Sequence, residues 1–315
     1  MTDRFRTRVD IEPSKDKIGY DTQCLFMGSC FAENMGERMK ALKFPVKLNP
    51  FGTLFNPASV VANLDLLIGG KQFTSADLVY HDGLWFSFSH YTGFAHPDQL
   101  RCLSGINSAM ENASVWLSQC RYMVLTFGTA WVYVYNRSGS IVANCHKIPA
   151  GEFTRSLLSP GKIIETLDGF LHRIREFNPG IRIIFTVSPV RHWKDGAVNN
   201  QLSKSILHYS IQEVLKVHPH TAYFPAYEIF MDELRDYRFY AADMLHPSEQ
   251  AVDYTWERFC DTWFDEQSRK TMAGVSAVLK AAAHRPSHTE TTNHKIFVDN
   301  TLKLIENLTG LYPFL

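Results

Sequence analysis

The stretch that decides the fold is Met27-Gly28-Ser29-Cys30-Phe31-Ala32-Glu33-Asn34. Residues 24–27, which lead into it, are apolar and few, as is typical of a buried strand, and residues 31–42 have the pattern of a helix. Ser29 is therefore expected at a strand-to-helix turn, where Gly28 allows a sharp bend of the backbone. Its hydroxyl would stand beside the free N–H groups of the first helical turn.

Two interpretations of Ser29 follow from this position. The turn has the local geometry of a nucleophile elbow, although the G-x-S-x-G pattern of that turn is absent. Serine is also a preferred helix cap, and Glu33 follows it in the first turn as in a capping box. This stretch alone favours the cap, and the choice depends on residues much later in the chain.

The composition indicates an ordinary globular protein. The chain has 315 residues, 45% of them hydrophobic, and its 32 basic side chains balance 32 acidic ones. A basic excess that would favour nucleic acid or an anionic membrane is lacking, so neither partner is expected. No signal peptide or membrane-spanning run is recognisable, which predicts a cytoplasmic protein. The six scattered cysteines are expected to be free thiols.

Three further apolar segments predict strands, at residues 122–127, 181–187 and 221–224. Helical segments separate them, and alternation of strands with helices predicts a parallel sheet covered on both faces, an α/β/α sandwich. Residues 131–145 predict an inserted β-hairpin around Asn136-Arg137-Ser138-Gly139.

Other segments are less regular. Residues 45–57 are expected to form a loop, and residues 152–177 two helical pieces on either side of Pro160-Gly161. Residues 1–267 are expected to form the main domain, and residues 268–315 a helical C-terminal appendage.

Polar residues follow the ends of the predicted strands and should gather at one edge of the sheet. Thr129 comes after Gly128 at the end of one strand, and Arg191 and His192 come shortly after the end of another. Arg191 and His192 could bind a carboxylate or phosphate of a substrate, or take part in a structural salt bridge. Weaker candidates for the same edge lie on the next helix: Asn200, Ser203 and Lys204.

A serine hydroxyl needs a base to become a nucleophile, and a histidine held by a carboxylate supplies one. Asp243-x-x-His246, just before Pro247, offers both groups within one turn. The alternative is that Asp243 caps the following helix and that His246 is a surface group. With 13 histidines in the chain, this spacing could also arise by chance.

The order of these features resembles that of the SGNH (GDSL-like) hydrolases. Gly28-Ser29 follows the first strand, Gly52 lies in the next loop, Gly128 ends a middle strand, and Asp243-x-x-His246-Pro247 comes near the end. The string Gly28-Ser29-Cys30-Phe31-Ala32 is more closely similar to the GSCFA family, which is named after it. Further similar stretches are residues 49–54, 127–131 and 188–192, and the resemblance spans roughly residues 4–263.

The resemblance implies a flavodoxin-like order of strands and ester hydrolysis through an acyl-enzyme. Ser29 would be the nucleophile, His246 the base and Asp243 its partner, while Gly52 and the Ser29 N–H would form the oxyanion hole. The asparagine of the superfamily's G-x-N-D stretch is missing, since Ala130 stands there. Either Thr129 or a residue of another loop replaces that donor, or the hole has only two donors.

These features predict a serine hydrolase that cleaves an ester, with an O-acyl group on a carbohydrate as a candidate substrate. The alternatives are a weak or inactive module that binds a glycan or acyl ligand, and a thiol enzyme that uses Cys30. No cofactor and no metal are expected. In particular, His218-Pro219-His220 has no third ligand spaced beside it in the sequence. The oligomeric state is left open.

Overall fold

The computed structural model describes residues 7–315, which build one five-stranded parallel sheet and several insertions. Numbered along the chain, the sheet strands lie in the order 2-1-3-4-5, the flavodoxin-like order. The expected α/β/α fold with a central parallel sheet is thereby confirmed. The strands, from one edge to the other, are β10 (Thr221–Tyr223), β9 (Arg182–Val187), β5 (Tyr122–Phe127), β1 (Cys24–Gly28) and β2 (Val46–Leu48).

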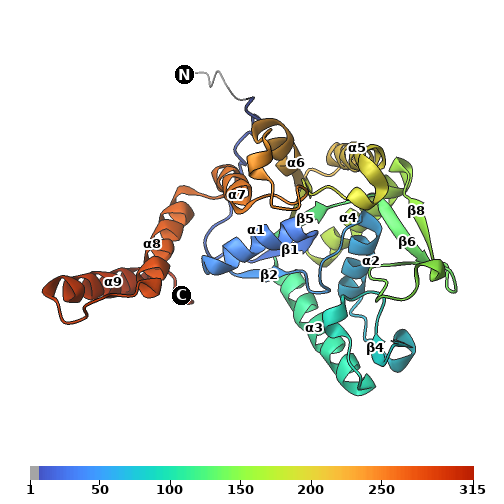
Figure 1. Cartoon of the computed structure of the whole chain (residues 1–315), viewed down its shortest axis with the longest axis horizontal. Coiled ribbons are helices and arrows are strands. Elements are labelled where there is room, and N and C mark those ends of the chain that lie inside the picture. Colours follow the sequence, from blue (N-terminus) through green and yellow to red (C-terminus); the bar gives the residue numbers. More distant parts are fainter. Residues whose placement is uncertain (1–6) are drawn as a thin grey trace.

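Helices cover both faces of the sheet (Figure 1). One face carries α2 (Pro57–Ile68), α3 (Gln99–Gln119), α4 (Pro160–Phe177) and α5 (Gly196–Leu215). The opposite face carries α1 (Cys30–Ala41) and α7 (Glu249–Trp263). Between β10 and α7 lies the short α6 (Ala226–Glu228), which continues into one π-helical turn, Ile229–Glu233.

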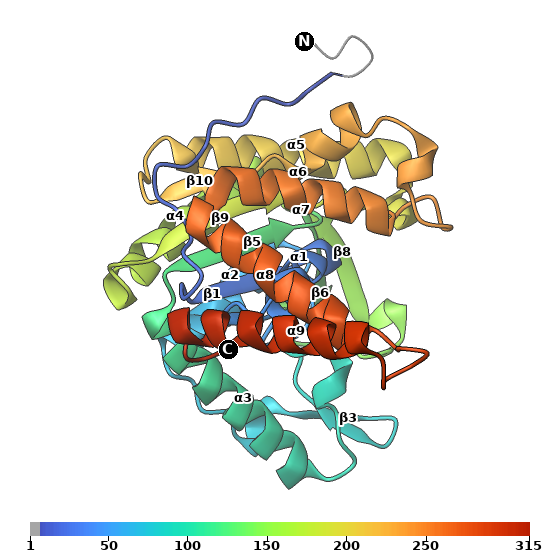
Figure 2. The same cartoon turned by 90° about the vertical axis from the view of Figure 1, so that its left-hand side faces the viewer.

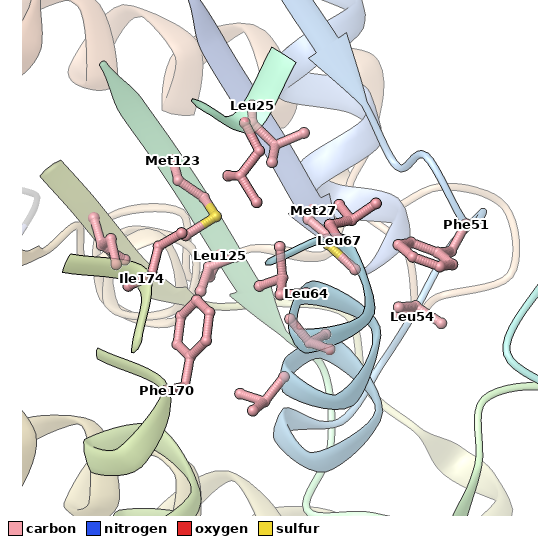
Figure 3. Packing of buried hydrophobic residues seen from close by; sticks show 14 of the residues in the cluster. Leu25, Met27, Phe51, Leu54, Leu64, Leu67, Met123, Leu125, Phe170 and Ile174 are labelled. Carbon is pink, nitrogen blue, oxygen red and sulfur yellow. The ribbon is translucent and has the colours of Figure 1, made fainter. Parts of the chain in front are cut away.

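The alternation of side chains along β1 divides the core between the two faces. Leu25 and Met27 belong to the cluster under α2 and α4, whereas Cys24 and Phe26 belong to the cluster under α1 and α7. Figure 3 shows Leu25 and Met27 facing Leu64 of α2. A strand that is buried on both faces has a continuous run of apolar residues, and for this reason β1 was recognisable in the sequence.

Two insertions depart from the sheet. A small antiparallel hairpin consists of β3 (Val79–His81) and β4 (Leu84–Phe86). The predicted hairpin is confirmed as β6 (Trp131–Tyr135) and β7 (Ser140–Val142), but β8 (Phe153–Leu157) pairs with β6 as a third strand. Single 3-10 turns occupy Ser75–Asp77, Thr92–Phe94, Ala150–Glu152, Trp193–Asp195 and Tyr237–Phe239.

Two predictions of local structure were therefore wrong. β8 lies where a helical piece was predicted, because pairing with β6 decides its conformation rather than local preference. The edge strand β2 lies within the predicted loop of residues 45–57, because its backbone pairs with β1. Its residues are only half buried, so they lack the apolar pattern of the other strands.

The C-terminal helices α8 (Glu266–Ala283) and α9 (Thr292–Leu311) extend away from the sheet (Figure 1). They lie on the side of α1 and α7, where Figure 2 shows them crossing in front of the sheet. Val275 and Leu308 bury their side chains in the core cluster of that side, and the ring of Tyr312 lies 4.9 Å from that of Tyr20. No helix in residues 7–315 combines the length and apolar character needed to cross a bilayer.

Gly28 ends β1 in a conformation that other residues rarely adopt, with a φ of +138°. A Cβ atom at this position would collide with the carbonyl group of Thr126 on β5. We expect Gly28→Ala to lower the free energy of unfolding by about 2 kcal/mol or more, since both strain and overlap oppose it. Urea denaturation measures this change.

Gly105→Ala is the matched control for this substitution. Gly105 lies in the middle of α3, and a Cβ there would meet no atom within 4 Å. The same change should leave stability unchanged or raise it by up to about 1 kcal/mol, because alanine is the better helix former. Equal effects at the two glycines would contradict the close approach of β1 and β5.

Candidate functional site

A cavity of about 650 Å³ opens at the C-terminal ends of the sheet strands. Five of the predicted site residues line it: Ser29, Thr129, Arg191, His192 and His246. Three others are not part of its lining: Gly52, Gly128 and Asp243. The structure thus brings residues from opposite ends of the sequence to one place, as the predicted topology required.

Ser29 occupies the position before α1, but its side chain makes no capping hydrogen bond. The residue is only 1% exposed, and its Oγ has no hydrogen-bond partner in the described part of the chain. Its backbone N–H donates to the Thr126 carbonyl at 3.0 Å. A buried hydroxyl without a partner costs stability, and capping does not explain it here.

The Asp243–His246 pair is formed. His246 Nδ1 lies 2.6 Å from Asp243 Oδ2, and Asp243 Oδ1 accepts the backbone N–H groups of Leu245 and His246 at 2.9 and 3.0 Å. Hydrogen bonds from the His246 and Leu245 backbone, then from the His246 ring, lower the pKa of Asp243 to about 2. An ionised Asp243 favours a proton on Nδ1 and leaves Nε2 free to act as a base.

The turn that forms this pair is unusual at Met244, which has a φ of +59°. A non-glycine residue in this region is uncommon and is often found at functional sites. Met244 donates its N–H to Ala241, and Ala241 donates its own to the His246 carbonyl, at 2.9 and 2.8 Å. The turn is thereby closed by the backbone as well as by the Asp243 carboxylate.

Ser29 and His246 line the same cavity without a hydrogen bond between their side chains, since Ser29 Oγ has no partner within residues 7–315. Catalytic hydrogen bonds are often long or poorly aligned in the absence of substrate. The structure therefore places Ser29 and His246 at one cavity, but it does not form the hydrogen bond between them that a catalytic triad requires.

The expected oxyanion donors are already engaged by backbone carbonyls. Gly52 donates its N–H to Asn49 at 2.7 Å, and Gly128 and Thr129 donate theirs to Phe55 at 2.7 and 3.0 Å. The Ser29 N–H is engaged as described above. In this conformation, none of these N–H groups is available to a substrate oxygen.

Two other donors belong to residues that line the cavity together with Ser29. The first helical hydrogen bond of α1 runs from the Glu33 N–H to the Ser29 carbonyl, which leaves the Cys30 N–H at the open end of the helix. Asn56 lines the cavity, and its Oδ1 accepts the Ser59 N–H at 2.8 Å as the cap of α2. Its Nδ2 donates to no group among the described residues.

One face of helix α5, formed by Asn200, Ser203 and Lys204, makes hydrogen bonds to the backbone that follows β5 and β9. Ser203 Oγ accepts the Ala130 N–H at 2.7 Å, and Asn200 Oδ1 accepts the His192 N–H at 2.9 Å. Ser203 and Lys204 follow Asn200 by three and four positions, about one helical turn, so the three residues share this face. Residues that were weak candidates in the sequence thus position the loops around the cavity.

Lys204 is the most unusual of the three because it is fully buried. Its Nζ donates to the carbonyl groups of Gly128 and Ser188 at 2.7 and 2.6 Å and so joins the ends of β5 and β9. Burial lowers its pKa to about 7, with smaller effects of Cys30, which raises it, and Arg191, which lowers it. Lysine is rarely buried without a charged partner.

The remaining walls are aromatic and basic. Burial, then the charges of Lys204, Arg155 and His246, lower the pKa of His192 to about 4, so this ring is neutral near pH 7. Arg155 lies over Trp131 of β6, 5.0 Å from its ring centre, and is paired with Asp195. No acidic side chain of the described chain forms an ion pair with Arg191, which leaves it free to meet an anionic group.

Cys30 also lines the cavity. Burial is the largest effect on its thiol and raises the pKa, whereas the backbone N–H groups of Phe31 and Cys30 lower it by less. A raised pKa reduces the thiolate fraction, and the thiolate is the reactive form. The environment of Cys30 therefore favours the serine over the thiol as nucleophile.

The fold also forms a group of polar side chains that the sequence did not suggest. Asp168 and His172 of α4 lie beside His218. Their ligand atoms all lie within 4.8 Å of one another. Sequence spacing could not show this group, because 40 residues lie between the end of α4 and His218. Only Asp168 and His172, an i, i+4 pair on α4, are close in the sequence.

The parallel sheet with a cavity at the C-terminal ends of its strands defines a flavodoxin-like α/β protein. The chain belongs to the GSCFA family, whose family model matches residues 23–259. A separate model, described as the C-terminal domain of GSCFA domain proteins, matches residues 275–315. No curated protein sequence matches the chain.

Two solved structures are similar in part. An acetyl xylan esterase, Est2A, from the rumen bacterium Butyrivibrio proteoclasticus is 12% identical, with a TM-score of 0.39, over 77% of this chain and 63% of that one. A carbohydrate esterase family 3 protein from Talaromyces cellulolyticus is 10% identical, with a TM-score of 0.28, over 53% and 65%. The chain thus spans less than two-thirds of either protein. Similarity of this degree carries no argument about activity.

The buried Lys204 predicts a specific pH dependence of stability. Its pKa is about 7 when folded and 10.5 when exposed, so between these values the unfolded chain binds more protons. The contribution of Lys204 to the free energy of unfolding should therefore rise as the pH increases from about 7 to about 10. Urea denaturation at pH 7, 8 and 9 measures the slope.

Lys204→Met isolates this contribution from that of other titrating groups. The variant should show a smaller rise in stability with pH than the unmodified chain. It should also be less stable at pH 9, because the Gly128 and Ser188 carbonyls lose their donor. Identical pH slopes for the two chains would show that Lys204 does not titrate in this range.

Proposed function

We propose that the chain is a serine hydrolase of the SGNH type that cleaves an ester through an acyl-enzyme. The observation that carries the proposal is the shared cavity of an unpartnered buried Ser29 hydroxyl and a His246 ring fixed by Asp243. Ser29 Oγ attacks the acyl carbon while His246 Nε2 accepts its proton. His246 then protonates the leaving alcohol, and water releases the acyl group by the same path.

The oxyanion of the tetrahedral intermediate is assigned to the Cys30 N–H and the Asn56 Nδ2 group. The positive end of the α1 dipole favours negative charge at this point. Asn56 would supply the side-chain donor that the superfamily's G-x-N-D asparagine provides elsewhere. This assignment replaces Gly52, whose N–H is engaged in its own turn.

The walls favour a carbohydrate as the alcohol part of the substrate. Trp131, Tyr133 and Trp193 line the cavity and offer flat apolar faces, while Asn144 and Arg191 add polar groups. Pockets of this kind combine apolar contact area with a few polar groups that fix orientation. An O-acylated sugar meets both requirements, and no cofactor enters the proposed reaction.

A second function, binding of a glycan or acyl ligand without turnover, has two observations in its favour. Ser29 Oγ is not bonded to His246, and the backbone N–H groups of Gly52, Gly128 and Thr129 are engaged. The two functions differ in whether Ser29 reacts, so they are separated by chemical labelling.

Labelling with a fluorophosphonate should modify the unmodified chain and the control Ser104→Ala, whose serine lies exposed on α3. Ser29→Ala and His246→Ala should not react, and Asp243→Asn should lower kcat on 4-nitrophenyl acetate by about 10⁴-fold through loss of the correct tautomer. Cys30→Ala should retain both reactions.

Failure of the unmodified chain to label, with no turnover of 4-nitrophenyl acetate or acetylated xylo-oligosaccharides, would overturn the hydrolase in favour of the binding module. Activity that survives Ser29→Ala but not Cys30→Ala would instead show a thiol enzyme.

Asn56→Asp tests the assigned oxyanion donor while keeping the helix cap. Aspartate retains an oxygen that accepts the Ser59 N–H, but it lacks the amide donor. We expect kcat to fall by about 10²- to 10³-fold with little change in Tm, as for loss of one oxyanion donor. An unchanged kcat would show that Asn56 does not contact the oxyanion.

A further inference from the structure

A second group of polar side chains lies at the opposite edge of the sheet, where β9 and β10 begin. Asp168 and His172 stand one turn apart on α4, and His218 comes from the loop between α5 and β10. Asp168 Oδ1 lies 2.8 Å from His218 Nε2 and 3.8 Å from His172 Nε2. This cluster shares no residue with the cavity that contains Ser29.

The geometry points to a binding site for one divalent transition-metal ion, with Zn²⁺ as its representative, held by Asp168, His172 and His218. Two imidazoles and one carboxylate are a common ligand set for such ions, whereas Mg²⁺ and Ca²⁺ prefer oxygen ligands alone. Three protein ligands leave one position for water.

The separations of the ligand atoms fit this ion. Ligands about 2.0–2.1 Å from a tetrahedral Zn²⁺ lie roughly 3.3 Å from one another. The two separations given above fall on either side of this value. A small rotation of His172, whose side chain is 70% exposed, would shorten the longer of the two.

The backbone around His218 makes the site rigid on one side. His218 donates its N–H to Val214 at the end of α5, and its carbonyl accepts the N–H and the hydroxyl of Thr221 at the start of β10. The residue is 5% exposed, and its ring packs edge-on against that of His172, with 5.1 Å between centres. One ligand is therefore preorganised, while Asp168 and His172 are accessible to an entering ion.

The charges around the cluster are mixed. His220 packs against His218 with 5.6 Å between ring centres. Arg175 and Arg182 lie near His220, and Arg182 is paired with Asp16. The carboxylate of Asp168 is the only negative ligand, which suits a single divalent ion with a bound water.

The position of the site indicates what the ion would do. It would join α4 to the start of the edge strand β10, far along the sheet from the ends where the reaction is proposed. The expected effect is on stability rather than catalysis, because an ion that binds only the folded chain raises its Tm. The site does not depend on the proposed hydrolase activity.

Titration of the untagged, EDTA-dialysed chain with Zn²⁺ should give one site per chain by calorimetry. Co²⁺ should produce visible absorption bands of tetrahedral coordination, and a large excess of Zn²⁺ over Kd should raise Tm by about 5 °C. His172→Ala and Asp168→Asn should each weaken binding by at least 10-fold. Neither should alter the Tm measured in EDTA by more than about 2 °C, since both side chains are partly exposed.

His288→Ala is the matched control, because His288 is an exposed histidine in the connection between α8 and α9. It should bind Zn²⁺ like the unmodified chain. The proposal is overturned if no site with Kd below about 100 µM is found. It is equally overturned if His172→Ala binds with unchanged stoichiometry and affinity, which would place the ion elsewhere on the chain.

Discussion

The candidate site depends on the close contact between the end of β1 and the elements beside it. Gly28 donates its N–H to the Asn49 side chain at 2.9 Å and accepts the Leu54 N–H at 2.8 Å, while its Cα passes against Thr126. Both backbone groups of one residue are thus bonded to the loop that follows β2. This contact fixes where Ser29 emerges and brings Asn56 of the same loop to the cavity wall.

The sequence was sufficient for the parts of the fold whose burial is uniform. β1, β5 and β9 are buried on both faces, so each appears as an apolar run, and the flavodoxin-like order came with the family resemblance. β2 and β8 were missed because they are half buried and depend on pairing with a strand distant in the sequence. No local pattern distinguishes such a strand from a loop or a short helix.

The residues of the candidate site could likewise be predicted from the sequence only in part. Asp243 and His246 form their pair within one turn, so their spacing carried the information. Asn56 and Lys204 were harder to recognise, because their roles arise from position: one is also a helix cap, and the other is a charged residue in a buried place. Asp168, His172 and His218 come together only through the packing of α4 against α5, which sequence spacing does not reveal.

The three-stranded sheet of β6, β7 and β8 has a consequence for how this protein can diversify. It contributes Trp131, Tyr133 and Arg155 to the cavity, yet it leaves the central sheet after Gly128 and returns before α4. This segment is held to the floor of the cavity by the Ala130 N–H, which donates to Ser203, and by the ion pair of Arg155 with Asp195. Ser29, Asp243 and His246 all lie outside it, so a change of sequence between residues 131 and 157 would alter the wall of the cavity without replacing any of these three residues.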